Sequence, residues 1–217
     1  MKERLAMYSK EKRRVSPSVI RRLPKYRRCL MELKNNGTQR ISSRELSRIT
    51  GLTASQIRQD LNNFGGFGQQ GYGYNVEELF DEVGAILGLD KEYTVVMVGV
   101  GNLGQAISNY LQNKEGFDLC AIFDMNPALI GSERCGLTVS DAVQLEEFLQ
   151  NNSVDIGIIA TDKSSAQGVA DVLSGAGVKG IWNFAPLDLV VPESVMLENV
   201  HLSDSLYTLA YYISEHE

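Results

Sequence analysis

The sequence predicts an α/β protein made of two modules, and three observations lead to this prediction. The chain has 217 residues, more than the roughly 100 to 150 of a typical single domain. Its first 75 residues hold 16 Lys and Arg against 5 Asp and Glu, whereas residues 76–217 hold 5 against 22. Helix caps mark the first part, and apolar strands alternate with helices in the second. We therefore expect a basic helical module that meets a polyanion, not merely an unstructured basic tail, followed by an acidic α/β module.

The composition excludes several classes of protein. Hydrophobic residues make up 43% and charged residues 22%, as in ordinary globular chains. No apolar run approaches the roughly 18 residues that cross a bilayer, and the charged N-terminus lacks the apolar stretch of a signal peptide, so a cytoplasmic protein is expected. Cys29, Cys120 and Cys135 stand far apart and only two histidines occur, which argues against a disulfide framework or a metal site such as zinc.

The basic module opens with strong helix signals. Ser16 and Pro17 are typical of a cap and a first helical residue, and apolar residues then recur at helical spacing, which predicts one helix with a kink at Pro24. Residues 42–45, Ser-Ser-Arg-Glu, form a capping box for a short helix that Gly51 ends.

A second capping box, at residues 53–56, opens a helix with Ile57, Leu61 and Phe64 on its apolar side. Two short capped helices joined by a glycine turn are typical of a helix-turn-helix, whose second helix enters the major groove of DNA. Arg58 is the expected base contact, because its guanidinium can donate two hydrogen bonds to guanine for roughly 1 to 3 kcal/mol of discrimination. The alternative is an arginine solvated on a helix face. The residues expected to face outward are Ser55, Gln56, Arg58 and Gln59.

A segment of alternating glycines and aromatics, residues 64–74, follows that helix. This pattern favours a twisted hairpin, and a hairpin after a recognition helix is a wing. Its tip at Gln70 and Gly71 has no cation, so we expect backbone to approach a groove without neutralising a phosphate. Core packing or a plain linker is the alternative. After the wing, Asn75 caps a helix that Gly88 ends and that connects the modules.

The acidic module begins with a buried strand and a glycine turn. Residues 94–98 are apolar, and Gly99-Val100-Gly101-Asn102-Leu103-Gly104 lies between that strand and a helix, so the GxGxxG motif stands in its required context. Gly99 permits the tight turn, Gly101 lets backbone approach a pyrophosphate, and Gly104 allows close packing of helix on strand. The helix N-terminus offers free N–H groups to the anion.

A second apolar strand, residues 119–123, ends in Asp124, 20 residues beyond Gly104. A carboxylate at this position accepts hydrogen bonds from the adenosine ribose and repels a 2′-phosphate, which favours NAD over NADP. A structural glycine turn, or another nucleotide such as coenzyme A, is the alternative.

Helices and strands then alternate, which predicts a Rossmann-like doubly wound parallel sheet. The expected helices are 141–150 and 164–173, and the expected strands are 154–160, 180–184 and 196–200. Ligands bind beyond the carboxyl ends of such strands, so Ala160-Thr161-Asp162 and Asn183-Phe184-Ala185-Pro186 should face the crevice of Gly101. A rigid turn set by Pro186 is the alternative for the second segment.

Residues 203–217 predict a short amphipathic helix that packs either on its own domain or on a second subunit. The module leaves no room for a substrate domain. Its histidines, His201 and His216, lie near the chain end, and no Ser/Tyr/Lys constellation accompanies the glycine motif, so an enzyme is not expected.

The chain as a whole resembles the Rex family of redox-sensing transcriptional repressors. The motifs that carry the resemblance are Arg22-Leu23-Pro24 with Tyr26 and Arg28, residues 55–61 with Phe64-Gly65 and residues 71–74, the glycine motif with Tyr110, Phe123-Asp124, residues 183–186 and residues 206–212. The resemblance implies a homodimer of winged-helix and Rossmann domains, each C-terminal helix being exchanged into the partner. It further implies that NAD(+) allows operator binding and NADH causes release. Arg58 would contact bases, Tyr110 would lie near the nicotinamide, and Arg28 would belong to the interface that responds to the redox state.

Four positions depart from the usual pattern of that family. Gln59 stands where Lys is common, Gln70 where Arg is common, Asp162-Lys163 where Pro-Ala is usual, and His201 where an Asp commonly pairs across the dimer. Fewer cations would meet DNA, and the polarity beside the expected nicotinamide ribose changes. We interpret the chain as a divergent paralogue with an altered operator preference or NADH response.

The predicted organisation is a winged-helix DNA-binding domain with connecting helix (1–87), a Rossmann NAD(H)-binding domain (88–202) and a domain-swapped dimerisation helix (203–217). The predicted function is a homodimeric repressor that binds double-stranded operator DNA and is released by NADH. The alternatives are another nucleotide, coenzyme A or NADP, or a lost redox response. The expected cofactor contacts are Gly99, Gly101, Asn102, Leu103, Gly104, Tyr110, Asp124, Ala160, Thr161, Asn183, Phe184 and Pro186, and Arg28 and His201 are expected at the redox-switch interface.

Overall fold

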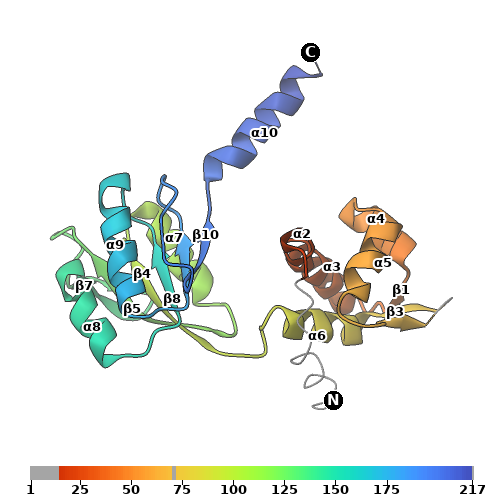
Figure 1. Ribbon diagram of the computed structural model, residues 1–217, viewed down its shortest axis with the longest axis horizontal. Helices are drawn as coiled ribbons and strands as arrows, with labels where there is room; N and C mark the ends of the chain where they lie inside the picture. The colour runs from red at the N-terminus through yellow and green to blue at the C-terminus, as the bar shows by residue number, and fades with distance from the viewer. Residues whose placement is uncertain (1–14, 70–71, 217) are drawn as a thin grey trace. The chain divides into compact units, whose positions relative to one another are not determined.

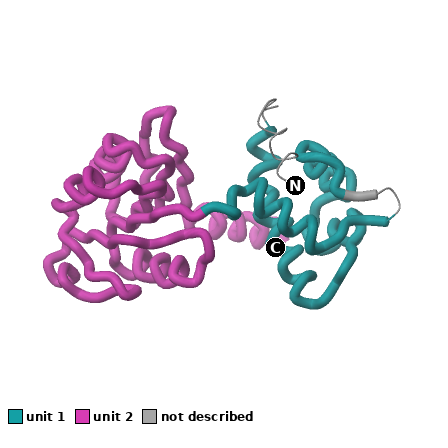
Figure 2. Tube along the Cα trace, turned by 90° about the horizontal axis from the view of Figure 1, so that it is seen from below, with its two compact units in different colours: residues 1–91 teal, residues 92–217 magenta. Residues whose placement is uncertain are grey.

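The computed structural model describes residues 15–69 and 72–216, and its chain divides into two compact units, residues 1–91 and 92–217 (Figure 2). The first unit consists of helices and a small sheet, and the second has a larger sheet flanked by helices (Figure 1). None of the helices in the described ranges combines the length and apolar character that a bilayer crossing needs.

In the first unit, helices enclose an apolar cluster that includes Leu23, Leu46 and Ile57. The helices are α2 (Pro17–Ile20), α3 (Leu23–Asn35), α4 (Ser43–Thr50), α5 (Ala54–Asn62) and α6 (Val76–Ile86). The strands are β1 (Arg40–Ile41), β2 (Gly68–Gln69) and β3 (Gly73–Asn75), in the antiparallel order β1-β3-β2.

One element of this unit differs from the prediction. The chain does not form a single kinked helix from Pro17 onward, because α2 ends after Ile20 and α3 begins at Leu23. Pro24 lies in the first turn of α3, where its missing N–H has no helical partner to lose. The proline therefore starts a helix here instead of bending one.

The predicted caps of α4, α5 and α6 are present. The Glu45 N–H donates to Ser42 Oγ and the Ser42 N–H donates to Glu45 Oε2, which completes the capping box. The Thr53 hydroxyl accepts from the Gln56 N–H, but the Gln56 side chain does not accept from the Thr53 N–H. This cap therefore has one of the two hydrogen bonds of a capping box. Asn75 accepts from the Glu78 N–H at the start of α6.

In the second unit, the sheet has the order β10-β9-β8-β4-β5-β7-β6. All neighbouring strands are parallel except β6 and β7. The strands are β4 (Tyr93–Val98), β5 (Phe117–Asp124), β6 (Glu133–Arg134), β7 (Leu137–Asp141), β8 (Ile156–Ile159), β9 (Gly180–Asn183) and β10 (Met196–Asn199). The helices are α7 (Asn102–Leu111), the 3-10 turn η1 (Ala142–Gln144), α8 (Leu145–Asn151), α9 (Lys163–Gly175) and α10 (Leu202–Ser214). The predicted doubly wound Rossmann-like sheet is confirmed, although β6 and β7 were not predicted.

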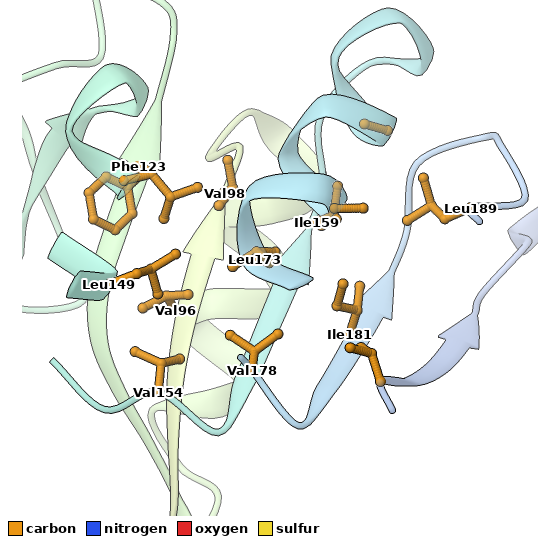
Figure 3. Close-up of a cluster of buried hydrophobic side chains, with 14 of the residues drawn as sticks. Val96, Val98, Phe123, Leu149, Val154, Ile159, Leu173, Val178, Ile181 and Leu189 are labelled. Atoms are coloured by element: carbon orange, nitrogen blue, oxygen red, sulfur yellow. The ribbon is translucent and has the colours of Figure 1, made fainter. Parts of the chain in front are cut away.

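Each face of this sheet has its own apolar core, which explains why β4 reads as a continuous apolar run. Val96 and Val98 point to the face that α8 and α9 cover, where Leu149 and Leu173 pack (Figure 3). Val95 and Met97 point to the opposite face, in a cluster that also holds Ile107 of α7. The sheet thereby holds the turn after β4 rigidly between two packed layers.

Candidate functional site

The exposed surface of α5 is the candidate DNA-binding surface of the first unit. Ile57 and Leu61 are buried as predicted, while Ser55, Arg58 and Gln59 are exposed. One Arg58 guanidinium N–H donates to Ser43 Oγ of α4 at 3.0 Å, which holds the side chain across the two helices of the helix-turn-helix. A guanidinium has five N–H donors, so four are left to meet bases or phosphates.

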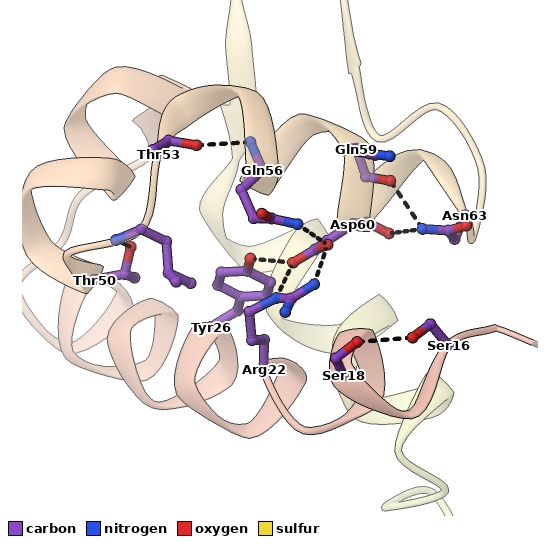
Figure 4. Close-up of polar contacts among 11 residues, drawn as sticks. Ser16, Ser18, Arg22, Tyr26, Thr50, Thr53, Gln56, Gln59, Asp60 and Asn63 are labelled. Carbon is purple, nitrogen blue, oxygen red and sulfur yellow. Dashed lines mark hydrogen bonds and ion pairs between the residues drawn. The ribbon is translucent and has the colours of Figure 1, made fainter.

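Gln56 differs from the prediction that it faces outward. Its side chain is half-buried, and its amide Nε2 donates to Asp60 Oδ1 at 3.2 Å (Figure 4). The reason is the helical spacing of four residues, which places Gln56 one turn before a buried carboxylate that needs donors. Gln56 thus supports α5 from within the unit.

The sequence analysis did not identify the role of that carboxylate, which joins α5 to the start of α3. The Asp60 side chain is fully buried and accepts from Arg22 Nε at 2.6 Å, Arg22 Nη2 at 2.7 Å and Tyr26 Oη at 2.6 Å (Figure 4). Burial alone would raise the pKa of Asp60, but the bonds from Arg22, Tyr26 and Gln56 outweigh it and lower the pKa. A charged residue between two core positions of a helix, Ile57 and Leu61, is the sequence signal that could have revealed it.

The wing is present where it was predicted, as the hairpin of β2 and β3. Its tip residues Gln70 and Gly71 lie outside the described residues. Gly73 is required at its position, because its φ is +70° and a Cβ there would lie 2.6 Å from the Ile41 carbonyl oxygen. Arg40 of β1 donates to the Tyr72 carbonyl at 3.4 Å, so a cation that is not part of the wing reaches it from the neighbouring strand.

In the second unit, the glycine turn between β4 and α7 is fixed by close contacts between backbone atoms. Gly99 has φ +92°, and a Cβ there would lie 2.6 Å from the Ala160 carbonyl oxygen. A Cβ on Gly104 would collide with the Gly99 carbonyl oxygen. A Cβ on Gly101 would meet nothing within 4 Å, which leaves open space in front of the N-terminus of α7. The roles predicted for the first and third glycines are confirmed, and the space at Gly101 fits a bound diphosphate.

Asp124 stands at the end of β5, beside this turn. Its Oδ2 accepts from the Val100 N–H at 2.7 Å, and its Oδ1 accepts from the Asn126 N–H at 2.8 Å. Two backbone donors therefore fix the carboxylate against the glycine turn, and its remaining lone pairs stay free for the hydroxyls of a ribose.

A crevice of about 180 Å³ opens beyond the carboxyl ends of β4, β5 and β8. It is lined by Val98, Gly99, Gly101, Asp124, Met125, Ala160, Thr161, Asp162, Ser165 and Val169. The structure thus brings together the glycine turn, the acid and the end of β8, as predicted. The volume is below the roughly 300 Å³ at which pockets for drug-sized ligands begin, so it fits the central part of a dinucleotide whose ends extend outside.

Four of the expected cofactor contacts outside the glycine motif, Asn183, Phe184, Pro186 and Tyr110, do not line this crevice. Asn183 is fully buried, and its amide donates to the Leu187 carbonyl at 2.7 Å and to Asn199 Oδ1 at 2.8 Å, so its polar groups serve the link between β9 and β10. Phe184 packs against Trp182 with the ring centroids 4.6 Å apart and the ring planes tilted by 59°, and neither Phe184 nor Pro186 lines the crevice. Tyr110, on α7, is 55% exposed and lies outside the lining as well.

The C-terminal helix α10 is not covered by the described residues of its own unit. Every residue from Leu202 to His216 is exposed, including Leu206, Leu209 and Ile213. Packing on its own domain, one of the two sequence-based options, is therefore wrong in this structure. His201 precedes the helix, and its Nε2 lies 2.8 Å from Asp188 Oδ1, which raises the pKa of His201. Arg28 is exposed on α3.

Comparisons with known proteins cover both units. Residues 14–62 match the family described as "Putative DNA-binding protein N-terminus", and residues 90–187 match the family described as "CoA binding domain". The redox-sensing transcriptional repressor Rex of Caldanaerobacter subterraneus subsp. tengcongensis is 59% identical, over 94% of this chain and 91% of that protein. Rex of Clostridioides difficile is 57% identical, over 93% of this chain and 96% of that protein.

Two solved structures match nearly the whole chain. RSP in complex with beta-NAD+ and operator DNA is 58% identical, with a TM-score of 0.88, and the match covers 94% of this chain and 95% of that one. RSP in complex with beta-NADH is 55% identical, with a TM-score of 0.87, and the match covers 94% and 97%.

Proposed function

This chain belongs to the Rex family of redox-sensing transcriptional repressors, and on that premise we propose that it is a homodimeric repressor that responds to the NADH/NAD(+) ratio. NAD(+) permits binding to operator DNA, and NADH causes release. The observation that carries the proposal is the crevice at the glycine turn, where Gly101 leaves room for a diphosphate and Asp124 is held ready for a ribose.

The DNA-binding step rests on α5 and its surroundings. Arg58 is exposed on the helix that would enter the major groove, with Ser55 and Gln59 beside it. Arg40 bonds to the wing hairpin at Tyr72, and Arg40, Arg44 and Arg48 are exposed. Phosphate contacts from such arginines orient the helix, and Arg58 supplies the discrimination between bases.

The coupling between nucleotide binding and operator binding rests on dimerisation. Because α10 exposes Leu206, Leu209 and Ile213, the helix would be covered by a second copy of the chain. Two recognition helices would then bind half-sites about one helical turn, or 34 Å, apart. Occupancy of the crevice would change the population of dimer geometries that have this spacing, and tenfold discrimination requires only about 1.4 kcal/mol of coupling.

The residues of this chain have distinct parts in nucleotide binding. The N–H groups at the start of α7 and the open side of Gly101 would hold the diphosphate, and Asp124 would accept from the adenosine ribose. When bound, NAD(H) supplies the redox signal, because its nicotinamide ring carries a positive charge only in the oxidised form. We propose no enzymatic activity, since no histidine, lysine, cysteine or tyrosine is among the described residues that line the crevice to activate the Thr161 or Ser165 hydroxyl. We also propose a cytoplasmic location, where DNA and the nicotinamide pool are both present.

A fluorescence anisotropy titration tests the proposal, with the operator duplex of the RSP complex as probe. We expect the purified chain to bind this duplex with saturating NAD(+) and to release it as NADH replaces NAD(+). Equal affinity in both forms would remove the redox response and leave a constitutive DNA-binding protein.

Coenzyme A is the second candidate ligand, because residues 90–187 match the CoA binding domain family. Calorimetric titrations with NADH, NADPH and coenzyme A distinguish the candidates. We expect NADH to bind most tightly. Asp124 would repel the 2′-phosphate of NADPH, and coenzyme A offers it no free ribose diol because its ribose carries a 3′-phosphate. Tighter binding of either competitor would contradict the choice of NAD(H).

A further inference from the structure

A second carboxylate, Asp162, lines the crevice on the side opposite Asp124. Asp124 ends β5, and Asp162 lies just beyond the end of β8, while β4 with its glycine turn runs between these two strands. Among the described residues that line the crevice, these two aspartates are the ionisable groups. The crevice is therefore acidic on both sides of the glycine turn.

The Asp162 carboxylate is held in place as the N-cap of α9. Its Oδ1 accepts from the Ser165 N–H at 2.9 Å and from the Ser164 hydroxyl at 2.7 Å. These bonds hold the pKa of Asp162 below its usual range, so the group is charged at neutral pH. Helix capping explains why an acid suits this position, but it does not require the acid to line the crevice.

The sheet topology places Asp162 beside the nicotinamide half of the ligand. A dinucleotide crosses a doubly wound sheet at the switch point, with its diphosphate at the helix after the first strand and one nucleoside on each side. The acidic residue at the end of the next strand marks the adenosine side, which is β5 with Asp124. The other nucleoside then lies toward β8, where Thr161 and Asp162 line the crevice.

We propose that the charge of Asp162 sets the redox preference of the crevice, by favouring the cationic, oxidised nicotinamide ring over the neutral, reduced ring. The inference rests on the proposed function. Oxidised and reduced ligands share the same diphosphate and riboses, so repulsion between Asp162 and the diphosphate cancels in the ratio of their affinities. Attraction to the positive ring does not cancel. Because Asp162 is exposed, solvent screens the attraction, and we expect an effect of about three- to tenfold on the ratio.

The consequence is a change in the NADH/NAD(+) ratio at which the protein releases its operator. A chain with a charged residue here releases the operator only at a higher NADH/NAD(+) ratio than the same chain with a neutral residue. Lys163 follows in the sequence and is exposed, but it does not line the crevice, so we expect its charge to matter less.

Calorimetry on the full chain tests this inference, with separate titrations of NAD(+) and NADH. Asp162→Asn removes the charge and keeps the cap, because Asn caps helices as well as Asp does. We expect the ratio of the NAD(+) dissociation constant to the NADH dissociation constant to rise about three- to tenfold, and the rise to shrink near 1 M salt. Asp171→Asn is the matched control: Asp171 is an exposed aspartate farther along α9 that pairs with Gln167 and does not line the crevice. In Asp171→Asn the ratio of the two dissociation constants should stay unchanged.

A second measurement separates charge from folding. The thermal midpoint of the ligand-free protein should be the same for the wild type and Asp162→Asn, and Asp162→Ser, with another capping residue, should give the same ratio as Asp162→Asn. An unchanged ratio in both variants, or an equal rise in Asp171→Asn, overturns the inference while the proposed function stands. A wild-type protein that binds neither nucleotide overturns the proposed function and the inference together.

Discussion

In the first unit, the proposed recognition helix α5 is held by a pair of opposite charges whose carboxylate is buried. In the second, the proposed nucleotide crevice is held by contacts between backbone atoms. Asp60 on α5 accepts hydrogen bonds from Arg22 and Tyr26 at the start of α3. The glycine turn is tied by the close approach of Gly99 to Ala160 and of Gly104 to Gly99.

The difference follows from what each unit must fix. A helix that contacts base edges must keep its rotation and tilt, and directional bonds to a buried charge restrict both. A crevice that receives a diphosphate needs a close approach of main chain, which only residues without a Cβ allow. Each unit therefore has its own vulnerable positions, and variants can test them one unit at a time.

The largest expected effect comes from breaking the charge pair. Asp60→Ala leaves Arg22 and Tyr26 without their partner, and we expect it to lower the free energy of unfolding of the first unit by about 2 to 4 kcal/mol. This loss of unfolding free energy is smaller than for a fully buried ion pair, because the Arg22 side chain is 23% exposed. Urea unfolding and operator binding measure the loss, and NADH binding should persist. Asp81→Ala, which alters an exposed aspartate of α6, should change stability by less than about 0.5 kcal/mol. A parallel loss of NADH binding in Asp60→Ala would contradict the separation of the two units.

The second-largest expected effect comes from a change to the glycine turn. Gly104→Ala places a Cβ against the Gly99 carbonyl, so we expect overpacking to cost about 1 to 3 kcal/mol and the first turn of α7 to move. NADH affinity, measured by calorimetry, should fall by more than about tenfold, with little change in operator binding by the free protein.

Gly168→Ala is the control for this variant. Gly168 lies in α9 and has nothing within 4 Å of an added Cβ, so the change should stabilise the helix by up to about 1 kcal/mol and leave NADH binding intact. Equal losses in both variants would show that helix composition, not the backbone contact, governs the crevice.

A smaller effect is expected on the DNA-binding surface itself. Arg58→Ala removes the exposed guanidinium and its bond to Ser43, and operator affinity should fall by about 1 to 3 kcal/mol. Arg58→Lys keeps the charge but loses the planar pair of donors, so it should restore non-specific binding without restoring discrimination. Competition between operator and random duplex measures both. Full discrimination by the lysine variant would assign base contacts to another residue.

The smallest expected effect concerns the start of α10. The bond to Asp188 raises the pKa of His201 in the folded protein, so the contribution of this pair to stability is fully present below the pKa of the unfolded chain, near 6.5. It is lost as the pH rises through the higher folded value. Titration of the histidine ring protons by NMR between about pH 5 and pH 9 measures this. Asp188→Asn should lower the His201 pKa, and an unchanged value would assign the shift to another group.

Local patterns in the sequence determined much of this protein. Capping boxes and glycine punctuation are read from neighbouring residues, so Ser42, Thr53 and Asn75 were identified as caps of their helices. The GxGxxG motif and Asp124 predicted the crevice, because the roles of its glycines depend only on the strand and helix beside them. The alternation of apolar segments predicted the parallel sheet.

The tertiary structure decided what depends on residues far apart in the chain. The sequence could not show that Asp60 bonds to Arg22, 38 residues earlier, or that Gln56 turns inward to the same carboxylate. Nor could it show that the Asn183 amide donates to Asn199 on the adjacent strand, or that residues 137–141 form β7 by pairing with β5 and β6. Caps and turns are determined by nearby atoms, whereas the partner of a buried polar group depends on which distant segments the packed core brings together.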